Sequence, residues 1–362
     1  MEEKLSPRRR LYDRGLRALL YLCGLLVCAL LVFLIGYIFY RGVPGITWSL
    51  LTSQTSYIKN TVGILPNILD TLYIIVVAMV IVLPLGVGAA IYLTEYASNR
   101  RLVSVIEFAT ETLTGIPSII FGLVGMLLFV QRMNLQAGIL AGGLTLVVMI
   151  LPTIVRTTQE SLKTVPQSYR EGALGLGAGK WHMIRTVVLP GAVDGIVTGC
   201  ILAVGRIVGE SAALLFTAGA AEVIAKGVVK AYTSNGATLS VLLYLRAFED
   251  GDFASAWGIG AVLLVLVLII GQVVFSGVMF SMTGALTAIS YIIVCRWGMG
   301  ALGASTDLND RLSWLKAGLD SPMYDATVPN LVHSWQMLGL ITLVCVAAAW
   351  LVLYIGFNRK KG

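Results

Sequence analysis

Residues 171–190 read EGALGLGAGKWHMIRTVVLP and connect two long apolar segments of the chain. An acidic residue favours the first turn of a helix, so we expect a short polar helix to begin near Glu171. We expect the glycines that follow, including Gly177, to break this helix and Pro190 to start the next apolar helix. The stretch therefore predicts a helical loop between two apolar spans.

Composition places the rest of the chain in a membrane. The sequence is 57% hydrophobic and 12% charged, with a mean hydropathy of +0.86, which excludes an ordinary soluble domain. About 20 apolar residues cross a bilayer as a helix, and the apolar runs here are that long. The sequence thus predicts an all-α integral membrane protein. The expected spans are 18–40, 70–94, 112–131, 138–156, 188–210, 256–275, 277–295 and 336–357. Seven or eight spans remain possible, because the uncharged run 253–295 holds two only if the chain turns near Ser276.

Basic residues predict the orientation of these spans. Lys and Arg stay in short cytoplasmic loops, and most of them fall inside if both termini are cytoplasmic. Residues 1–17 then form a cytoplasmic basic tail, and the first apolar run stays as a membrane anchor. The net charge of +7 reflects this topology, so it does not indicate a nucleic-acid partner. The basic residues can contact membrane lipid.

Several motifs that could indicate a metal or nucleotide site are incomplete. All five cysteines lie in apolar runs without CxxC spacing, and His182 and His333 are far apart, so we predict no metal site. The glycines at 175–179 lack the residues of a phosphate-binding loop, and Gly298 to Gly303 match GxGxxG without a βαβ unit. We predict that the chain is not an enzyme and binds no cofactor.

The fifth expected span carries small residues and charges on one helical face. Gly191, Gly195 and Gly199 recur every four residues, which predicts close packing against another helix. Arg206 and Glu210 continue nearly the same stripe, so they should face protein or water and not lipid. Two interpretations stay open. In one, the two side chains form a structural ion pair. In the other, Arg206 binds an anion transiently, while Glu210 weakens that binding and helps to gate the pathway.

The third expected span begins with a sequence that breaks helices. Gly115, Pro117 and Ser118 interrupt the hydrogen-bond ladder, which is tolerated inside a membrane only where backbone faces protein or water. Such breaks occur at the substrate sites of transporters, although a structural kink is the alternative. Glu107 and Glu111, near the cytoplasmic edge, are interpreted as a solvated helix face.

From about residue 15 to about residue 270 the chain resembles the PstA permeases of bacterial phosphate ABC transporters. Glu171, Ala173, Gly177, Leu189 and Pro190 match the E-A-A-x3-G-x9-I-x-L-P loop of ABC importer permeases, and Gly172 stands where Ala is usual. The other matching segments are Gly63 to Asn67 with Asp70 to Leu72, Ile91 to Ala97, Gly115 to Ser118, and Arg206 to Gly219.

The resemblance implies a type I importer fold with six core helices, here with about two extra C-terminal spans. It implies a heterodimer with a sister permease, two cytoplasmic ATPase subunits that hold ATP and Mg²⁺, and an extracytoplasmic phosphate-binding protein. Residues 157–187 would form the loop that couples to the ATPase. Arg206 and Glu210 would lie on the translocation pathway, with the break at Gly115, Pro117 and Ser118.

The tail departs from this family. Residues 276–362 faintly resemble the end of ABC-2-type exporter membrane domains, and their role stays open beside a transmembrane domain of residues 18–275. We expect a permease subunit of a phosphate importer in a bacterial plasma membrane. The alternatives are a permease for sulfate or molybdate, a non-transporting scaffold or fusion, and half of an exporter.

Overall fold

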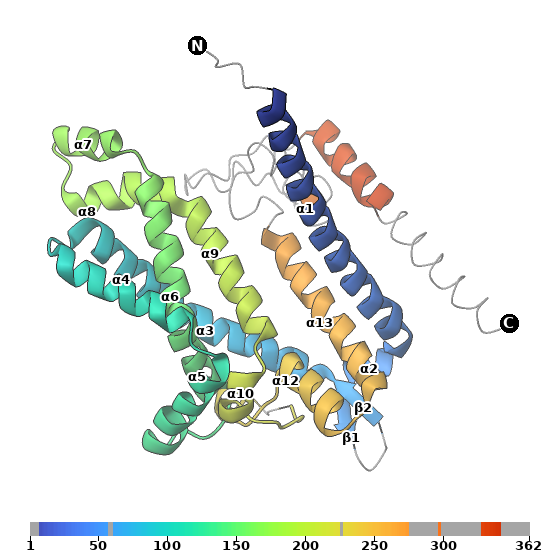
Figure 1. The fold of residues 1–362 in the computed structure, drawn as a ribbon. Coiled ribbons are helices and arrows are strands. Elements are labelled where there is room, and N and C mark those ends of the chain that lie inside the picture. The colour runs from blue at the N-terminus through green and yellow to red at the C-terminus, as the bar shows by residue number, and fades with distance from the viewer. Residues whose placement is uncertain (1–6, 57–60, 225–226, 275–295, 298–326, 342–362) are drawn as a thin grey trace.

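Long apolar helices dominate the computed structural model of this chain (Figure 1). The structure describes residues 7–56, 61–224, 227–274, 296–297 and 327–341. The longer α-helices, each of at least 8 residues, are α1 (Pro7–Gly42), α3 (Leu65–Ile91), α4 (Arg100–Thr114), α5 (Ser118–Gly125), α6 (Ile139–Thr164), α7 (Gln167–Gly175), α9 (Leu189–Gly209) and α13 (Phe253–Val274).

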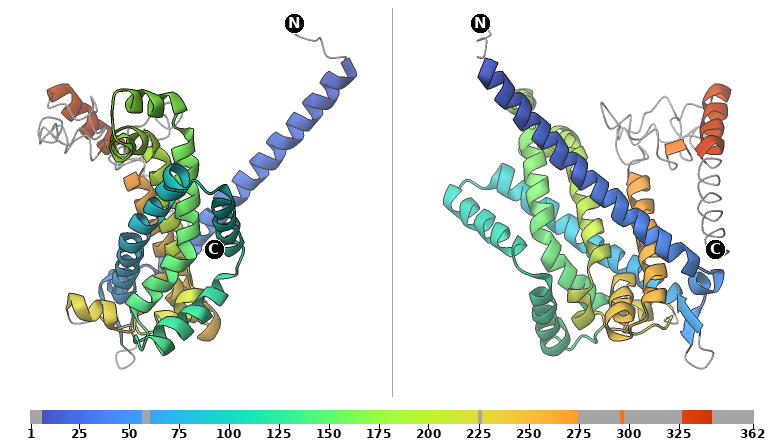
Figure 2. Two further views of the ribbon diagram at one scale, coloured as in Figure 1. Left: turned by 90° about the vertical axis from the view of Figure 1, so that its left-hand side faces the viewer. Right: turned by 45° about the vertical axis from the view of Figure 1, so that its right-hand side comes forward.

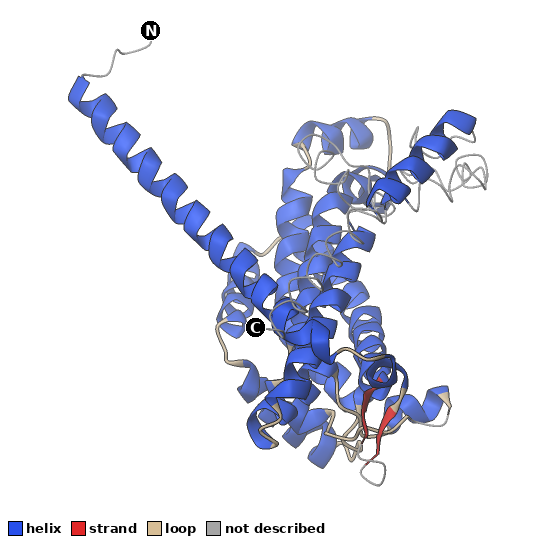
Figure 3. Ribbon diagram, turned by 90° about the vertical axis from the view of Figure 1, so that its right-hand side faces the viewer, coloured by secondary structure: helices blue, strands red, loops and turns tan. Residues whose placement is uncertain are grey.

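Shorter elements join these helices. The short α-helices are α2 (Trp48–Thr52), α8 (Lys180–Met183), α10 (Ala212–Thr217), α11 (Val228–Thr233) and α12 (Leu239–Tyr244). One turn, η1 (Val43–Gly45), is a tight 3₁₀ helix. The wider π-helical turns are η2 (Tyr92–Tyr96), η3 (Met126–Arg132), η4 (Ile184–Val188) and η5 (Leu245–Glu249). Strands β1 (Gln54–Ser56) and β2 (Thr61–Ile64) pair antiparallel as the one small sheet of the described residues (Figure 3).

Within the described residues, four helical segments are long and apolar enough to cross a bilayer: Gly15–Gly45, Leu65–Tyr96, Ile139–Thr164 and Lys180–Gly209. The bent pair Arg100–Thr114 and Ser118–Arg132 passes the same test when its halves are taken together, and Phe253–Ile269 adds a shorter apolar helix. Six core membrane elements therefore follow in the expected order. The predicted spans 277–295 and most of 336–357 lie outside the described residues.

The expected span over 112–131, with a break at its start, corresponds to a bent pair of helices that begins earlier in the chain. Helix α4 begins already at Arg100, and the chain bends by 101° between α4 and the α5–η3 helix. Pro117 lies at this bend, where it lacks a backbone N–H to donate and is followed by a new helix from Ser118. The predicted break at Gly115–Ser118 is thus confirmed, and it is sharper than a kink.

The two ends of the bundle differ. Helices α7 and α8 form one end, called here the α7 end, and strands β1 and β2 lie at the other, the hairpin end (Figure 1). Helix α1 starts on the α7 side, stands away from the bundle there, and approaches α13 near the hairpin end (Figure 2). At that contact Tyr37 packs edge to face on Trp257, with ring centroids 5.5 Å apart.

Three buried apolar clusters hold the bundle together. The largest joins α3, α5, α6, α9, α10 and α12 and includes Ile74, Leu146, Ile150 and Ile207. A second, at the α7 end, joins the last turns of α3 and α6 to α8, η4 and α9 through residues such as Leu162 and Ile184. Helix α3 contributes to both clusters, so it connects the two ends of the core.

Candidate functional site

The segment from Gln167 to Val188 projects from the α7 end as a helix, a glycine turn and a second short helix. Gly177 has a positive φ of 86°, which an L side chain adopts at a cost. Its N–H donates to the Leu174 carbonyl at 2.9 Å, and the Ala178 N–H donates to the Ala173 carbonyl at 3.1 Å. This is the Schellman arrangement that ends helices at glycine, so Gly177 fixes where α7 stops.

The outer face of this segment is open to solvent. Glu171 and Gly172 are exposed, Ala173 is half-buried, and the Leu176 side chain is 92% exposed at the tip of the turn. A groove of about 540 Å³ runs beside the turn. It is lined by Ala173, Leu176, Gly177, Ala178, Gly179, His182 and Thr186. This face of the segment is therefore accessible to another protein.

Helix α9 begins at Leu189 with Pro190 in its first turn, as predicted, but other helical turns directly precede it. Helical structure runs without interruption from Lys180 through η4 into α9 and on to Gly209. Proline lacks a backbone N–H, and its ring crowds the carbonyl four residues earlier. The wider turn η4 (Ile184–Val188) precedes Leu189 and Pro190 and leaves room for this ring. Leu189 is half-buried and packs against the cluster at the α7 end.

A buried ion pair at the base of α7 was not predicted. The Arg170 guanidinium donates to Glu95 Oε1 through Nη2 at 2.9 Å and through Nε at 3.1 Å. It also donates to the Leu162 carbonyl at 2.7 Å and to the Val165 carbonyl, at the end of α6. The two side chains are only 10% and 7% exposed. The available signal was a lone glutamate ending an apolar span and an arginine directly before Glu171.

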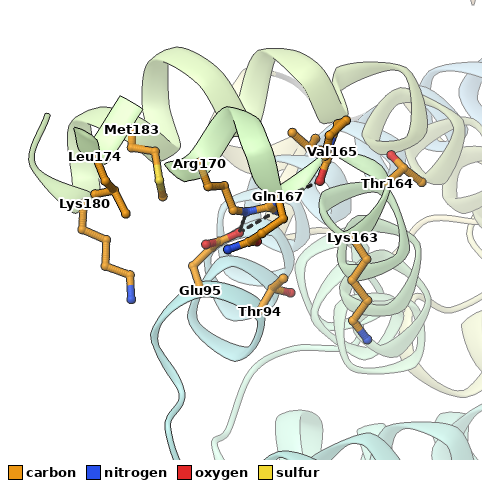
Figure 4. A pocket seen from close by; sticks show the side chains of 11 residues that line it. Thr94, Glu95, Lys163, Thr164, Val165, Gln167, Arg170, Leu174, Lys180 and Met183 are labelled. Atoms are coloured by element: carbon orange, nitrogen blue, oxygen red, sulfur yellow. Dashed lines mark hydrogen bonds and ion pairs between the residues drawn. The ribbon is translucent and has the colours of Figure 1, made fainter. Parts of the chain in front are cut away.

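The neighbouring residue Tyr96 contacts the second helix of the segment. Lys180 Nζ lies 4.9 Å from the centroid of the Tyr96 ring, at cation–π distance. Together Glu95 and Tyr96 hold α7 and α8 beside a cavity of about 570 Å³ (Figure 4). The cavity is lined by Thr94, Glu95, Lys163, Thr164, Val165, Pro166, Gln167, Arg170, Leu174, Lys180 and Met183.

The glycine stripe of α9 packs on α6, as predicted. A Cβ on Gly191 would meet Val165 Cγ2 at 3.1 Å, and a Cβ on Gly195 or Gly199 would overlap the Ser161 or Thr157 side chain. The contacted residues of α6 are also four apart, so the two helices meet in antiparallel register. Small residues at this spacing let the backbones approach closely.

Arg206 and Glu210 do not form an ion pair among the described residues, so the first of the two interpretations fails in this conformation. Helix α9 ends at Gly209, and Glu210 turns away as its C-cap. The Glu210 side chain accepts the Ala213 N–H at 3.0 Å, and the Ser240 hydroxyl donates to its carbonyl at 2.7 Å. Glu210 is buried and stabilises the start of α10, whereas Arg206 is half-buried.

The break at residues 115–118 joins α4 to α5 and contacts the core of the bundle. Ile116 packs against the large apolar cluster that contains Ile207 and Ala203 of α9. Gly115 and Pro117 are exposed, and Ser118 is half-buried.

Glu107 and Glu111 lie on a solvent-accessible helix face, as expected, and they also pair with residues of α6. Both remain partly exposed, but Glu111 Oε1 lies 3.2 Å from Arg156 Nη1, and Glu107 Oε1 lies 3.6 Å from Lys163 Nζ. These contacts tie α4 to α6 at the α7 end. Exposed pairs of this kind contribute little to stability.

No group of three or more His, Cys, Asp or Glu residues is placed to hold a metal ion in the part of the chain that the structure describes.

The sequence matches a family of transport proteins. Residues 82–279 fit the family described as "Binding-protein-dependent transport system inner membrane component". The chain belongs to this family. The matched range contains α4 to α13 and the whole segment around Glu171, so the site described above lies within the family's own domain.

Curated relatives agree with this assignment and confirm the resemblance to PstA permeases. The permease is 38% identical over 211 residues to the probable ABC transporter permease protein YqgI of Bacillus subtilis, covering 58% of this chain and 72% of that protein. It is 34% identical over 234 residues to the phosphate transport system permease protein PstA of Xylella fastidiosa, covering 64% and 79%. The PstA of Mycobacterium leprae is 31% identical over 269 residues, covering 73% and 87%.

Solved structures support the fold. The permease superposes with a TM-score of 0.51 and 15% identity on a chain of a bacterial ABC transporter that imports the acidic polysaccharide alginate, covering 73% of this chain and 98% of that chain. At this identity the match bears on the fold alone. It confirms the expected type I importer arrangement of the core helices.

Proposed function

We propose that the chain is a membrane-embedded permease subunit of an ATP-driven importer of inorganic phosphate. The observation that carries this proposal is the exposed helix α7, which presents Glu171 and Leu176 to solvent while its base is fixed by buried contacts. A separate ATPase can bind such an exposed helix. The phosphate transport permeases of Xylella and Mycobacterium, with which the chain aligns over most of their length, support the substrate.

Two ATPase subunits, which bind ATP and Mg²⁺, are proposed to dock at the α7 end. A sister permease completes the pathway, and a phosphate-binding protein delivers the anion at the hairpin end. Charge distribution supports this orientation, because Arg100, Lys163, Lys180 and Arg185 lie at the α7 end or on elements that reach it. Short basic segments stay in the cytoplasm. The protein then lies in a bacterial inner membrane with its N-terminus inside, and residues 18–275 are the transport domain.

Phosphate is proposed to pass the Arg206 side chain. In the conformation observed here this guanidinium has no hydrogen-bond or ion-pair partner among the described residues, while Glu210 is engaged by Ala213. The fork of a guanidinium matches two oxygens of a tetrahedral oxyanion. Binding and release then follow from a shift between two states of the permease pair, driven by nucleotide and by the loaded binding protein.

Uptake of radiolabelled phosphate tests the substrate. The chain would be expressed with its partner subunits in cells that lack their own high-affinity phosphate system. We expect ATP-dependent uptake that excess unlabelled phosphate abolishes and excess sulfate or molybdate leaves intact. Uptake that sulfate or molybdate displaces would assign the permease to another oxyanion.

A further inference from the structure

We infer that Glu95 and Arg170 are positioning residues that transmit movement of α7 to helix α3. The inference rests on the proposed function and names the helix that receives the movement imposed by the ATPase. Covalently, α7 continues from α6 and leads through α8 and η4 into α9. Helix α3 is distant in sequence, and its end meets α7 and α8 through side chains from Glu95 and Tyr96.

The hydrogen bonds of Arg170 hold the base of α7 to the end of the α3 segment and to the end of α6. Four hydrogen bonds from one guanidinium join the end of η2 to the last carbonyls of α6. Leu162 lies in the last turn of α6 and Val165 is its C-cap, so the arginine also caps α6. The pair is nearly excluded from solvent, and separating it would leave a buried charge without its partner.

Other charged contacts at the α7 end differ from this pair. Arg156 and Glu111 are 56% and 68% exposed, and Lys163 and Glu107 are 59% and 42% exposed. Water can replace those contacts when helices move, because exposed pairs are weak. The Glu95–Arg170 pair is therefore the firm link between α7 and α3 at this end.

Movement that reaches Glu95 also has a route to the hairpin end. The run from Leu65 to Tyr96 is one continuous helical segment. At its far end Asn67 donates to the Ala237 carbonyl at 2.8 Å, and Thr71 accepts the Leu239 N–H at 3.0 Å. The next residue, Ser240, donates to the Glu210 carbonyl. Helix α3 thus links the base of α7 to the turn that follows Arg206 and Glu210.

The test measures phosphate moved per ATP hydrolysed by the full complex in proteoliposomes, together with recovery of the assembled complex. The variants are Glu95→Gln and Arg170→Lys. Glutamine keeps the shape and one acceptor but removes the charge, and lysine keeps the charge but loses the planar fork. Glu160→Gln is the matched control, because Glu160 is exposed and its one ion pair among the described residues is with Arg156 on its own helix.

We expect both variants to assemble and to hydrolyse ATP, while phosphate moved per ATP falls by about tenfold, a size common for coupling between two sites. The control should keep the wild-type ratio. A purely structural role would lower uptake and hydrolysis together, in proportion to the assembled complex, and would overturn the inference. An unchanged ratio in Glu95→Gln would also overturn it. A wild-type complex that hydrolyses ATP but moves no phosphate would refute the proposed function instead.

Discussion

Gly195 of α9 lies so close to Ser161 of α6 that a Cβ on the glycine would come within 2.7 Å of the serine Cβ. Gly191 and Gly199, one turn away on either side, make equivalent approaches to α6. The contact between α6 and α9 thus depends on the absence of three side chains. Movement between these helices can occur only as a rigid unit or by separating them.

The first prediction concerns this contact. Gly195→Ala should lower the free energy of unfolding by about 1–3 kcal/mol, the usual cost of overpacking a tight interface. Thermal unfolding of the purified chain in detergent measures the change. Gly88→Ala is the control, because Gly88 lies in α3 with no atom within 4 Å of an added Cβ. Equal melting temperatures for the two variants would disprove the close-packing account.

The second prediction concerns docking of the ATPase. Glu171→Lys should reduce ATPase binding by about 2 kcal/mol or more, as expected for a central residue of an interface. Glu171 is exposed and has no hydrogen bond or ion pair among the described residues, so the fold should not change. Co-purification of the ATPase with a tagged permease measures the loss. Full recovery of the ATPase with this variant would remove α7 from the docking surface.

The third prediction separates the remaining roles of Arg206. Arg206→Gln should lower phosphate uptake by about tenfold or more, which corresponds to loss of a charged hydrogen bond worth 1.5–3 kcal/mol. Assembly with the sister permease should be unaffected, because the described structure gives Arg206 no ion pair to lose. Arg206→Lys should retain part of the uptake, since it keeps the charge. Failure of the Gln variant to assemble would instead indicate a structural role.

The fourth prediction concerns the start of α13 and its pH dependence. Asp252 Oδ1 accepts the Ser255 N–H at 3.1 Å and caps the helix. Hydrogen bonds from the Ser255 side chain and N–H lower the pKa of the Asp252 carboxyl. A lowered pKa stabilises the fold above the unfolded-state value of about 3.9, and this contribution is lost as pH falls through the folded-state value.

At pH 7 Asp252→Ala should therefore lower the free energy of unfolding by about 1 kcal/mol, the typical cost of a lost N-cap. The difference from wild type should shrink as the medium is acidified through the folded-state pKa, because protonation removes the contribution of the charge to the hydrogen bond. Asp252→Asn should keep the cap at every pH, because an amide oxygen accepts the same hydrogen bond without titrating. A difference between wild type and the Ala variant that does not depend on pH would contradict the assignment.

Local patterns predicted much of this structure. The four-residue spacing of Gly191, Gly195 and Gly199 predicted the helix contact because it depends only on which face of one helix is small. Gly115 and Pro117 predicted a break for an equally local reason. The order of the core spans followed from the lengths of the apolar runs.

Contacts between distant segments were beyond such patterns. Nothing local joins Glu95 to Arg170, 75 residues apart, because the pairing depends on how α3 and α6 end side by side. The helical stripe of Gly191, Gly195, Gly199 and Arg206 does not continue to Glu210, because α9 ends at Gly209. The Glu210 carboxylate instead accepts the Ala213 N–H. Pro190 predicted the start of α9 but not the helical turns before it, because the wide turn η4 leaves room for the proline ring.

Reconstitution tests the central claim most directly, that this permease couples a separate ATPase to phosphate movement. The full complex in sealed liposomes would be given ATP inside, and loaded phosphate-binding protein outside. The account predicts ATP-dependent accumulation of radiolabelled phosphate with the wild-type chain and none with Glu171→Lys. An assembled wild-type complex that hydrolyses ATP without accumulating phosphate would contradict it.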